Sequence, residues 1–223
     1  SRRRHTRYIS VTGVQTCALP ILALSEQKHE IRSLSLSDQA LPGVPHIQYK
    51  ISRGNTPQID PLIREFESKI IRAKACTEKL MQLKKEGFEP DLVIAHPGWG
   101  EPLFVKDVFE KTLLVNFIEF YYQKDSDAFF DQEFTKPTAE SFMRLRIKNT
   151  NNLLALEGMD FGLCPTQWQF STIPVAYQSK VKVIFDGVNT EIVKPDPLAT
   201  LPLKHSNGKQ DRKSTRLNSS HTD

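Results

Sequence analysis

Short apolar runs of strand length alternate along this chain with longer segments that have the periodicity of helices. The apolar runs lie at 22–24, 92–95, 113–118, 161–164 and 181–185, and residues 47–51 have the alternation of a half-exposed strand. The main helical segments lie at 60–87, 101–109 and 138–158. Parallel strands need a crossover connection, which is usually a helix, so this alternation indicates βα units. We therefore predict an α/β fold with a Rossmann-like parallel sheet and flanking helices, in which the strands at 92–95 and 113–118 are buried on both faces.

Capping residues stand at the ends of several predicted helices. Asp60 followed by Pro61 is typical of a helix N-terminus, and Gly87 is typical of the position after a helix C-terminus. Thr166 and Gln169 have the spacing of a capping box. These signals predict one helix that is capped by Asp60 and another that begins directly after Thr166.

The two terminal segments are related to each other through their codons. Each of the eleven residues from Val11 to Ile21 has a codon that is the reverse complement of a codon for its partner between Asp211 and His221, read in the opposite direction. Selection on a protein does not produce such a pair, whereas an inverted DNA repeat does. We therefore interpret residues 1–21 and 211–223 as translated sequencing adapter, and we expect both segments to be disordered.

The net charge of the chain depends on these two segments. The full chain has 30 Lys and Arg against 26 Asp and Glu, a formal net charge of +4. Without the terminal segments, 23 basic and 24 acidic residues remain, and the net charge becomes −1. Binding of nucleic acid through bulk positive charge is therefore excluded as an interpretation.

Cysteine usage and hydropathy bear on the location of the protein. Only Cys76 and Cys164 lie outside the terminal segments, and they are far apart. This usage indicates neither a disulfide framework nor a metal cluster, so we predict a reducing, cytoplasmic location. No apolar run approaches the roughly 18–20 residues of a membrane span. A location at the inner face of the membrane stays open, although no basic amphipathic helix supports it.

Polar and aromatic side chains follow three of the predicted strands. In open α/β sheets, ligands bind beyond the carboxyl ends of the strands, where loops and helix N-termini gather. His96 follows the strand at 92–95 and Glu119 follows the strand at 113–118, so both are candidate catalytic residues that could supply acid, base and hydrogen-bonding groups. The candidate substrate-binding residues are glycines that would let a ligand approach, aromatic rings that would stack on a sugar, and two polar side chains: Gly98, Trp99, Gly100, Glu101, Tyr121, Tyr122 and Thr166.

Structural roles for the same residues stay open. His96 could be a capped core histidine, and Glu119 could form a structural salt bridge. The aromatic residues could pack in a core, and Thr166 could serve only as a helix cap. The histidine and the glutamates lack the compact ligand spacing of zinc or calcium sites, so we expect no metal.

These residues lie in stretches that resemble family 4 glycosyltransferases, in the amino-terminal half of their two-domain, twin-Rossmann (GT-B) architecture. The matching stretches are Pro90–Glu101, Leu103–Phe109, Glu119–Tyr122, Asn152–Glu157, Cys164–Gln169 and the sequence VIFDGVNT from Val183. The resemblance implies retaining transfer of a sugar from a nucleotide sugar to a glycan or lipid-linked acceptor, as in polysaccharide biosynthesis, and usually no cofactor. It also implies that His96 and Glu119 lie in the acceptor cleft, with Glu119 at the strand-end position where family members often have a histidine that contacts the transferred sugar.

The same resemblance predicts how the domain is composed. Residues 22–197 are an incomplete acceptor-side domain, and residues 198–210 are an interdomain tail. Family members begin with a strand, a glycine-containing loop and a helix, so we expect the first strand, which is central, to be missing. Because a carboxyl-terminal domain holds most of the donor, we expect this polypeptide alone to be inactive and to fold poorly. The alternative is a sugar-nucleotide epimerase or a non-catalytic sugar-binding module of the same architecture.

Overall fold

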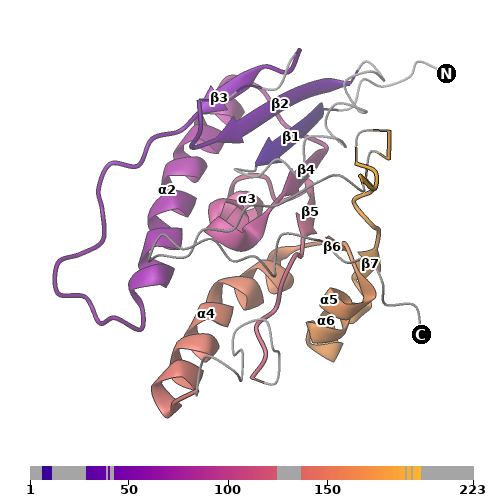
Figure 1. Cartoon of the computed structure of the whole chain (residues 1–223). Helices are drawn as coiled ribbons and strands as arrows, with labels where there is room; N and C mark the ends of the chain where they lie inside the picture. Colours follow the sequence, from indigo (N-terminus) through magenta and orange to yellow (C-terminus); the bar gives the residue numbers. More distant parts are fainter. Residues whose placement is uncertain are drawn as a thin grey trace. The chain divides into compact units, whose positions relative to one another are not determined.

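The computed structural model describes residues 7–11, 29–38, 40, 43–124, 137–188, 190–191 and 193–196. Within these residues, seven parallel strands form one sheet in the order β3-β2-β1-β4-β5-β6-β7 (Figure 1). The strands are β1 (Arg7–Val11), β2 (Glu30–Ser35), β3 (His46–Gln48), β4 (Leu92–Ala95), β5 (Leu113–Phe117), β6 (Phe161–Cys164) and β7 (Val181–Val183). The α-helices are α2 (Arg64–Lys85), α3 (Val105–Val108), α4 (Ala139–Gly158), α5 (Gln167–Thr172) and α6 (Val175–Gln178), and the 3-10 helices are η2 (Pro97–Trp99) and η3 (Glu101–Phe104). The predicted α/β fold with a Rossmann-like parallel sheet is confirmed.

The chain divides into two compact units, Ser1–Asp186 and Gly187–Asp223. Every strand and helix named above belongs to the first unit. The apolar run at 22–24, the boundary expected at 197, the tail at 198–210 and the segment 211–223 lie outside the described residues.

Arg7–Val11 forms β1 at the centre of the sheet, between β2 and β4. Its backbone pairs with both neighbours, and Ile9, opposite Val93 of β4, is 1 % exposed. The Arg7 N–H donates to the Asp91 carboxylate over 2.8 Å. The expectations that the central strand is missing and that residues 7–11 are disordered are therefore wrong. Backbone pairing on two sides and a buried β-branched side chain are enough to place this segment in a sheet, whatever the origin of its codons.

The strand order reverses next to β1. β2 and β3 lie on one side of β1, and the chain then crosses to the other side, where β4 to β7 follow. At such a switch point the connections of neighbouring strands run in opposite directions, which leaves a crevice beyond the carboxyl ends of the strands. His96 is the first residue after β4 and therefore lies at this crevice.

α2 packs on the centre of one face of the sheet. Its side chains Cys76, Leu80 and Leu83 share a core cluster with Val93 of β4 and Leu114 of β5. Burial of one aliphatic side chain of this size contributes about 1.5–3 kcal/mol to stability, so the cluster fixes α2 against the sheet.

The two ends of α2 agree with the sequence to different degrees. Gly87 has a φ of 81° and follows the helix, as predicted. The predicted N-cap is wrong, because α2 begins at Arg64. Asp60 forms a turn instead, in which its carboxylate accepts the Leu62 N–H over 2.8 Å.

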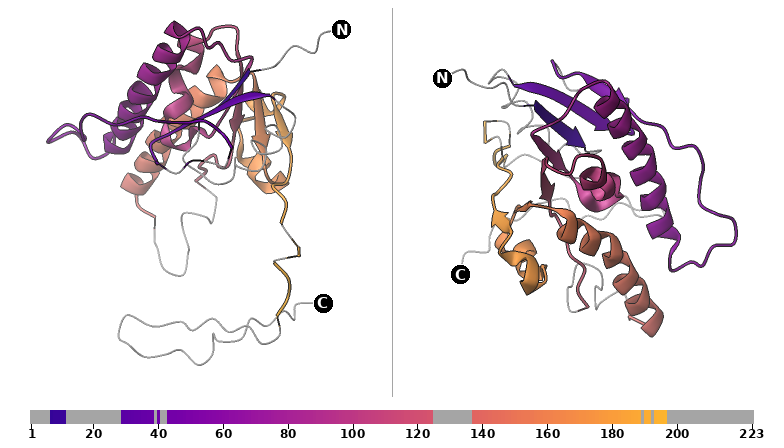
Figure 2. Two further views of the ribbon diagram at one scale, coloured as in Figure 1. Left: turned by 90° about the horizontal axis from the view of Figure 1, so that it is seen from above. Right: turned by 180° about the vertical axis from the view of Figure 1, so that it is seen from behind.

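α4 lies on the same side of the sheet as α2 and α3 (Figure 2). Thr138 caps its N-terminus in a capping box with Ser141. Leu156 and Met159 at its C-terminal end pack with Cys164 of β6 in a second core cluster. The N-terminal turns of α2 and α4 both point toward the carboxyl edge of the sheet, because each helix connects two parallel strands.

Two predicted details differ from the structure. The segment 101–109 contains the 3-10 helix η3 followed by the single turn α3, rather than one continuous helix. The strands at 92–95 and 113–118 are not fully buried on both faces: Val93 and Leu114 are buried, whereas Leu113 is 48 % exposed. The buried residues face α2 and α3, and the register places Leu113 beside Leu92 on the opposite face.

Candidate functional site

His96 and Glu119 meet at the carboxyl edge of the sheet. His96 Nε2 lies 3.0 Å from Glu119 Oε2, although 23 residues separate the two in sequence. The His96 side chain is 8 % exposed and the Glu119 side chain is 48 % exposed. The connections after β4 and β5 therefore bring the two candidate catalytic residues into direct contact, with the carboxylate as the accessible partner.

Hydrogen bonds orient the imidazole ring of His96. The Gly98 N–H donates to His96 Nδ1 over 3.1 Å. When Nδ1 accepts, the proton of a neutral imidazole resides on Nε2, which then donates to the Glu119 carboxylate. The pair is thus a donor and an acceptor in fixed orientation, and Glu119 keeps further acceptor capacity for a ligand hydroxyl.

A cavity of about 70 Å³ adjoins this pair. It is lined by polar groups and by aromatic side chains of the connections after β4 and β5: His96, Gly98, Phe117, Glu119, Phe120 and Tyr122, with Lys69 of α2 and Asn152 of α4. The Phe120 ring lies 5.2 Å from the Tyr122 ring and 5.6 Å from the Trp168 ring, measured between centroids. Carboxylate, ammonium and amide groups beside aromatic rings are the chemistry that binds the hydroxyls and the C–H faces of a sugar.

Three asparagines of α4 hold the two connections in place, and the sequence reasoning missed them. Asn151 Nδ2 donates to the Pro97 carbonyl over 2.7 Å, in the connection after β4. Asn149 exchanges hydrogen bonds with the backbone of Tyr122, and Asn152 Nδ2 donates to the Phe120 carbonyl, both in the connection after β5. These amides stand at buried positions of α4, where a polar group needs a partner, and the backbone of the two connections supplies it.

The other predicted residues of the connection after β4 lie apart from the cavity. Glu101 is 2 % exposed, and its Oε1 accepts the Tyr49 hydroxyl over 2.6 Å and pairs with Arg72 over 3.4 Å. Gly100 has a φ of 96°, and a Cβ there would lie 2.5 Å from the Lys69 carbonyl oxygen. Trp99 is 50 % exposed, with the Arg72 guanidinium 5.0 Å from its ring centroid. The structure therefore places Gly100 and Glu101 against α2 rather than beside His96.

The remaining candidates are divided between the cavity and its surroundings. Tyr122 lines the cavity, whereas Tyr121 packs against the second core cluster, and burial raises the pKa of its hydroxyl. Thr166 caps α5 by accepting the Gln169 N–H over 3.1 Å, as predicted, but the reciprocal half of the predicted capping box is not formed. Gln169 in turn donates from Nε2 to the Glu119 carbonyl over 2.8 Å. Thr166 and Gln169 thus connect α5 to the backbone that presents Glu119.

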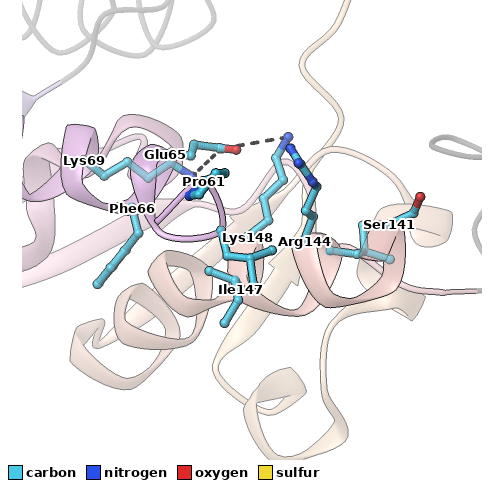
Figure 3. A pocket seen from close by; sticks show the side chains of 10 residues that line it. Pro61, Glu65, Phe66, Lys69, Ser141, Arg144, Ile147 and Lys148 are labelled. Carbon is cyan, nitrogen blue, oxygen red and sulfur yellow. Dashed lines mark ion pairs between the residues drawn. The ribbon is translucent and has the colours of Figure 1, made fainter. Parts of the chain in front are cut away.

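A second and larger cavity lies between the N-terminal turns of α2 and α4. Its volume is about 290 Å³, and its charged lining residues are Glu65, Lys69, Arg144 and Lys148. The Glu65 carboxylate lies 3.1 Å from Lys69 Nζ and 3.9 Å from Lys148 Nζ (Figure 3). Lys69 is 6 % exposed and lines both cavities. None of these four residues follows a strand, so the rule that selected the other candidates could not select them.

Electrostatic effects extend from the site to two further groups. Burial is the main cause that raises the pKa of the Tyr122 hydroxyl, and the charges of Glu65 and Glu119 raise it further. Burial also raises the pKa of Asp186, and Glu119 adds to that shift. Tyr122 therefore lies within the field of a carboxylate from each cavity.

The described part of the chain also bears on metal binding and on membrane spanning. No group of three or more His, Cys, Asp or Glu side chains there is placed to hold a metal ion. No helix among the same residues is long and apolar enough to cross a membrane.

Several solved structures are similar to this chain, at low sequence identity, and two with a TM-score of 0.50 share its fold. Sucrose-phosphate synthase from Thermosynechococcus elongatus is 11 % identical with a TM-score of 0.50, and the match covers 83 % of this chain and 92 % of that one. The calicheamicin glycosyltransferase CalG4 is 12 % identical with a TM-score of 0.50, and the match covers 90 % of this chain and 57 % of that one. UDP-GlcNAc 2-epimerase from Neisseria meningitidis is 15 % identical with a TM-score of 0.44, over 80 % and 45 % of the two chains. The chain thus spans about half the length of the last two proteins.

Comparisons of sequence give a more specific result. No curated protein matches the chain. A family model described as glycosyl transferase family 4 group matches residues 25–193, and this range contains both cavities and the His96–Glu119 pair. The match covers most of the chain and includes six of the seven strands, β2 to β7, so the chain belongs to the glycosyl transferase family 4 group.

Proposed function

We propose that this chain is the acceptor-side domain of a retaining glycosyltransferase that transfers a sugar from a nucleotide sugar to a glycan or lipid-linked acceptor. The observation that carries this proposal is the His96–Glu119 pair beside a cavity at the carboxyl edge of the sheet. Membership of the glycosyl transferase family 4 group supports sugar transfer as the reaction.

In the proposed reaction, Glu119 binds the attacking hydroxyl of the acceptor. The hydroxyl oxygen forms a bond to the anomeric carbon of the donor sugar on the same face from which the diphosphate oxygen departs, so the bond to that oxygen breaks and the configuration is retained. The hydroxyl proton passes to the Glu119 carboxylate, and the nucleoside diphosphate leaves with the electron pair of the broken bond. His96 orients the carboxylate through its Nε2–H, so its contribution acts through Glu119.

The donor nucleotide is proposed to bind mainly to a carboxyl-terminal domain, so the polypeptide alone is expected to be inactive. The earlier expectation of poor folding rested on a missing central strand, and β1 removes that premise. We place the reaction in the cytoplasm, where the free thiols of Cys76 and Cys164 would stay reduced.

The test uses a protein in which this chain is followed by a donor-binding domain. Release of nucleoside diphosphate and mass spectrometry of the glycosylated acceptor measure transfer. Glu119→Gln is expected to lower kcat about 100-fold, because a carboxamide cannot take the hydroxyl proton. The matched control is Glu110→Gln, at an exposed glutamate shortly before β5. This variant is expected to leave kcat unchanged. Unaltered kcat in Glu119→Gln would remove Glu119 from the reaction.

The alternative activities give different products in the same assay. An epimerase converts a nucleotide sugar into its epimer without an acceptor, which chromatography of the nucleotide sugars detects. A sugar-binding module binds an acceptor but releases no nucleoside diphosphate in any combination of substrates. Either result would contradict the transferase proposal.

A further inference from the structure

The cavity between α2 and α4 combines an apolar wall with a cationic rim. Its apolar lining consists of Pro61, Leu62, Phe66, Leu145 and Ile147. Its volume of about 290 Å³ is close to the lower end of the roughly 300–1,000 Å³ that ligand pockets occupy, so it suits one sugar residue. We call it the α2–α4 cavity.

Positive charge dominates the lining of the α2–α4 cavity. Three cations, Lys69, Arg144 and Lys148, line it together with one carboxylate, Glu65. Arg144 is also paired with Glu140 over 2.7 Å, but that glutamate is not part of the lining. The N-terminal turns of α2 and α4 add the positive ends of two helix dipoles. Both sources of field favour a negatively charged ligand.

Lys69 and Tyr122 connect this cavity to the His96–Glu119 pair. Lys69 lines both cavities, and the Lys148 ammonium lies 4.6 Å from the centroid of the Tyr122 ring. Tyr122 lines the smaller cavity next to Glu119. A ligand in the α2–α4 cavity would therefore be adjacent to the group that is proposed to bind the acceptor hydroxyl.

We propose that the α2–α4 cavity binds a sugar residue of the acceptor that carries an oxyanion, either a phosphate or a uronate carboxylate. Lys69, Arg144 and Lys148 contact the oxyanion, and Phe66 packs against the sugar ring. This inference rests on the proposed function, because it assigns the ligand to the acceptor. The acceptor is accordingly an acidic glycan or a sugar phosphate rather than a neutral glycan.

Calorimetric titrations of the full chain at low ionic strength test the inference with four probes: glucuronate, glucose 1-phosphate, glucose and inorganic phosphate. At least one of the two anionic sugars is expected to bind about tenfold more tightly than both glucose and inorganic phosphate, because the cavity contacts the ring and the charge together. The stronger of the two anionic sugars identifies the oxyanion. Equal binding of glucose and the anionic sugars, or of inorganic phosphate and the anionic sugars, would overturn the inference.

Charge-removing variants locate the binding. Lys148→Gln and Arg144→Gln are each expected to weaken the anionic sugar about tenfold, whereas Lys148→Arg retains most of the affinity. Arg146→Gln, at an exposed arginine of the same helix that does not line the cavity, is the matched control. Near-ultraviolet circular dichroism checks that each variant is folded, and two independent cations keep the test valid if one variant is not. Unchanged affinity in a folded Lys148→Gln or Arg144→Gln variant would place the ligand elsewhere.

Competition separates an acceptor site from a donor site. UDP is added to the complex with the anionic sugar, and displacement of the sugar would show that the cavity holds a diphosphate of the donor instead. Failure of this inference and failure of the proposed function are distinguishable. If Glu119→Gln abolishes transfer but no anionic sugar binds to the chain, only the proposed acceptor class is refuted. If an anionic sugar binds but the unaltered protein transfers no sugar, only the proposed function is refuted.

Discussion

Glu101 and Glu119 follow neighbouring strands at the same edge of the sheet, yet their environments are opposite. The Glu101 side chain is 2 % exposed and is held by Tyr49 and Arg72. The Glu119 side chain is 48 % exposed, and its partner His96 also lines a cavity. A position after a strand therefore does not by itself make a carboxylate a ligand contact.

The packing of α2 accounts for this difference. α2 supplies Arg72 to Glu101, and its backbone at Lys69 touches Gly100. The connection after β4 thus has an outer half at His96–Gly98, which faces the smaller cavity, and an inner half at Gly100–Glu101, which α2 covers. The outer half is available for binding, and the inner half anchors the connection to the core.

Truncation of each glutamate provides the largest expected difference in stability. Glu101→Ala is expected to lower the free energy of unfolding by about 2–4 kcal/mol, because it leaves the buried Tyr49 hydroxyl and the partly exposed Arg72 guanidinium without their carboxylate. Glu119→Ala is expected to change it by less than about 1 kcal/mol, since the Glu119 carboxylate is half exposed and solvent screens its interaction with His96. Urea denaturation followed by circular dichroism measures both. Similar losses in the two variants would break the comparison.

Substitution of the two glycines tests the inner and outer halves of the connection. Gly100→Ala is expected to cost about 1–3 kcal/mol of stability, because φ is 96° and the added Cβ would meet the Lys69 backbone. Gly98→Ala would place a Cβ 2.6 Å from the His96 ring, so the ring must move. We expect Gly98→Ala to lower transfer activity with a smaller loss of stability. A larger loss of thermal stability in Gly98→Ala than in Gly100→Ala would contradict the division into halves.

Asp160 is a third carboxylate, intermediate between Glu101 and Glu119. Burial raises its pKa, but the Leu114 N–H and the Lys106 ammonium outweigh burial and hold the pKa below its ordinary value of 3.8. A lowered pKa in the folded state contributes stability that is present above about pH 4 and is lost as the pH falls through the folded pKa. Asp160→Asn is therefore expected to cost about 1 kcal/mol or less at pH 7 and to lose stability less steeply than the unaltered chain below about pH 5. Urea titrations at a series of pH values measure this, and parallel pH profiles would contradict it.

Much of the site could be predicted from the sequence because strand ends gather at one edge of a parallel sheet. That rule selected His96 and Glu119, which the structure brings to within 3.0 Å of each other. The rule could not tell that Glu119 is accessible while Glu101 is buried, because this difference depends on which residues α2 covers. It also could not find Lys69, Lys148 or the asparagines of α4, because their roles arise from contacts between helices and connections that are distant in sequence.

The sequence by itself determined the class of fold, most strand positions, the cap at Thr166 and the glycine after α2, because periodicity and capping are local properties of the chain. Only the tertiary structure decided that Arg7–Val11 completes the sheet and that Asp60 forms a turn before α2 begins. It also decided which side chains share a cavity. These outcomes depend on pairing partners and on burial, and neither is a property of a short segment alone.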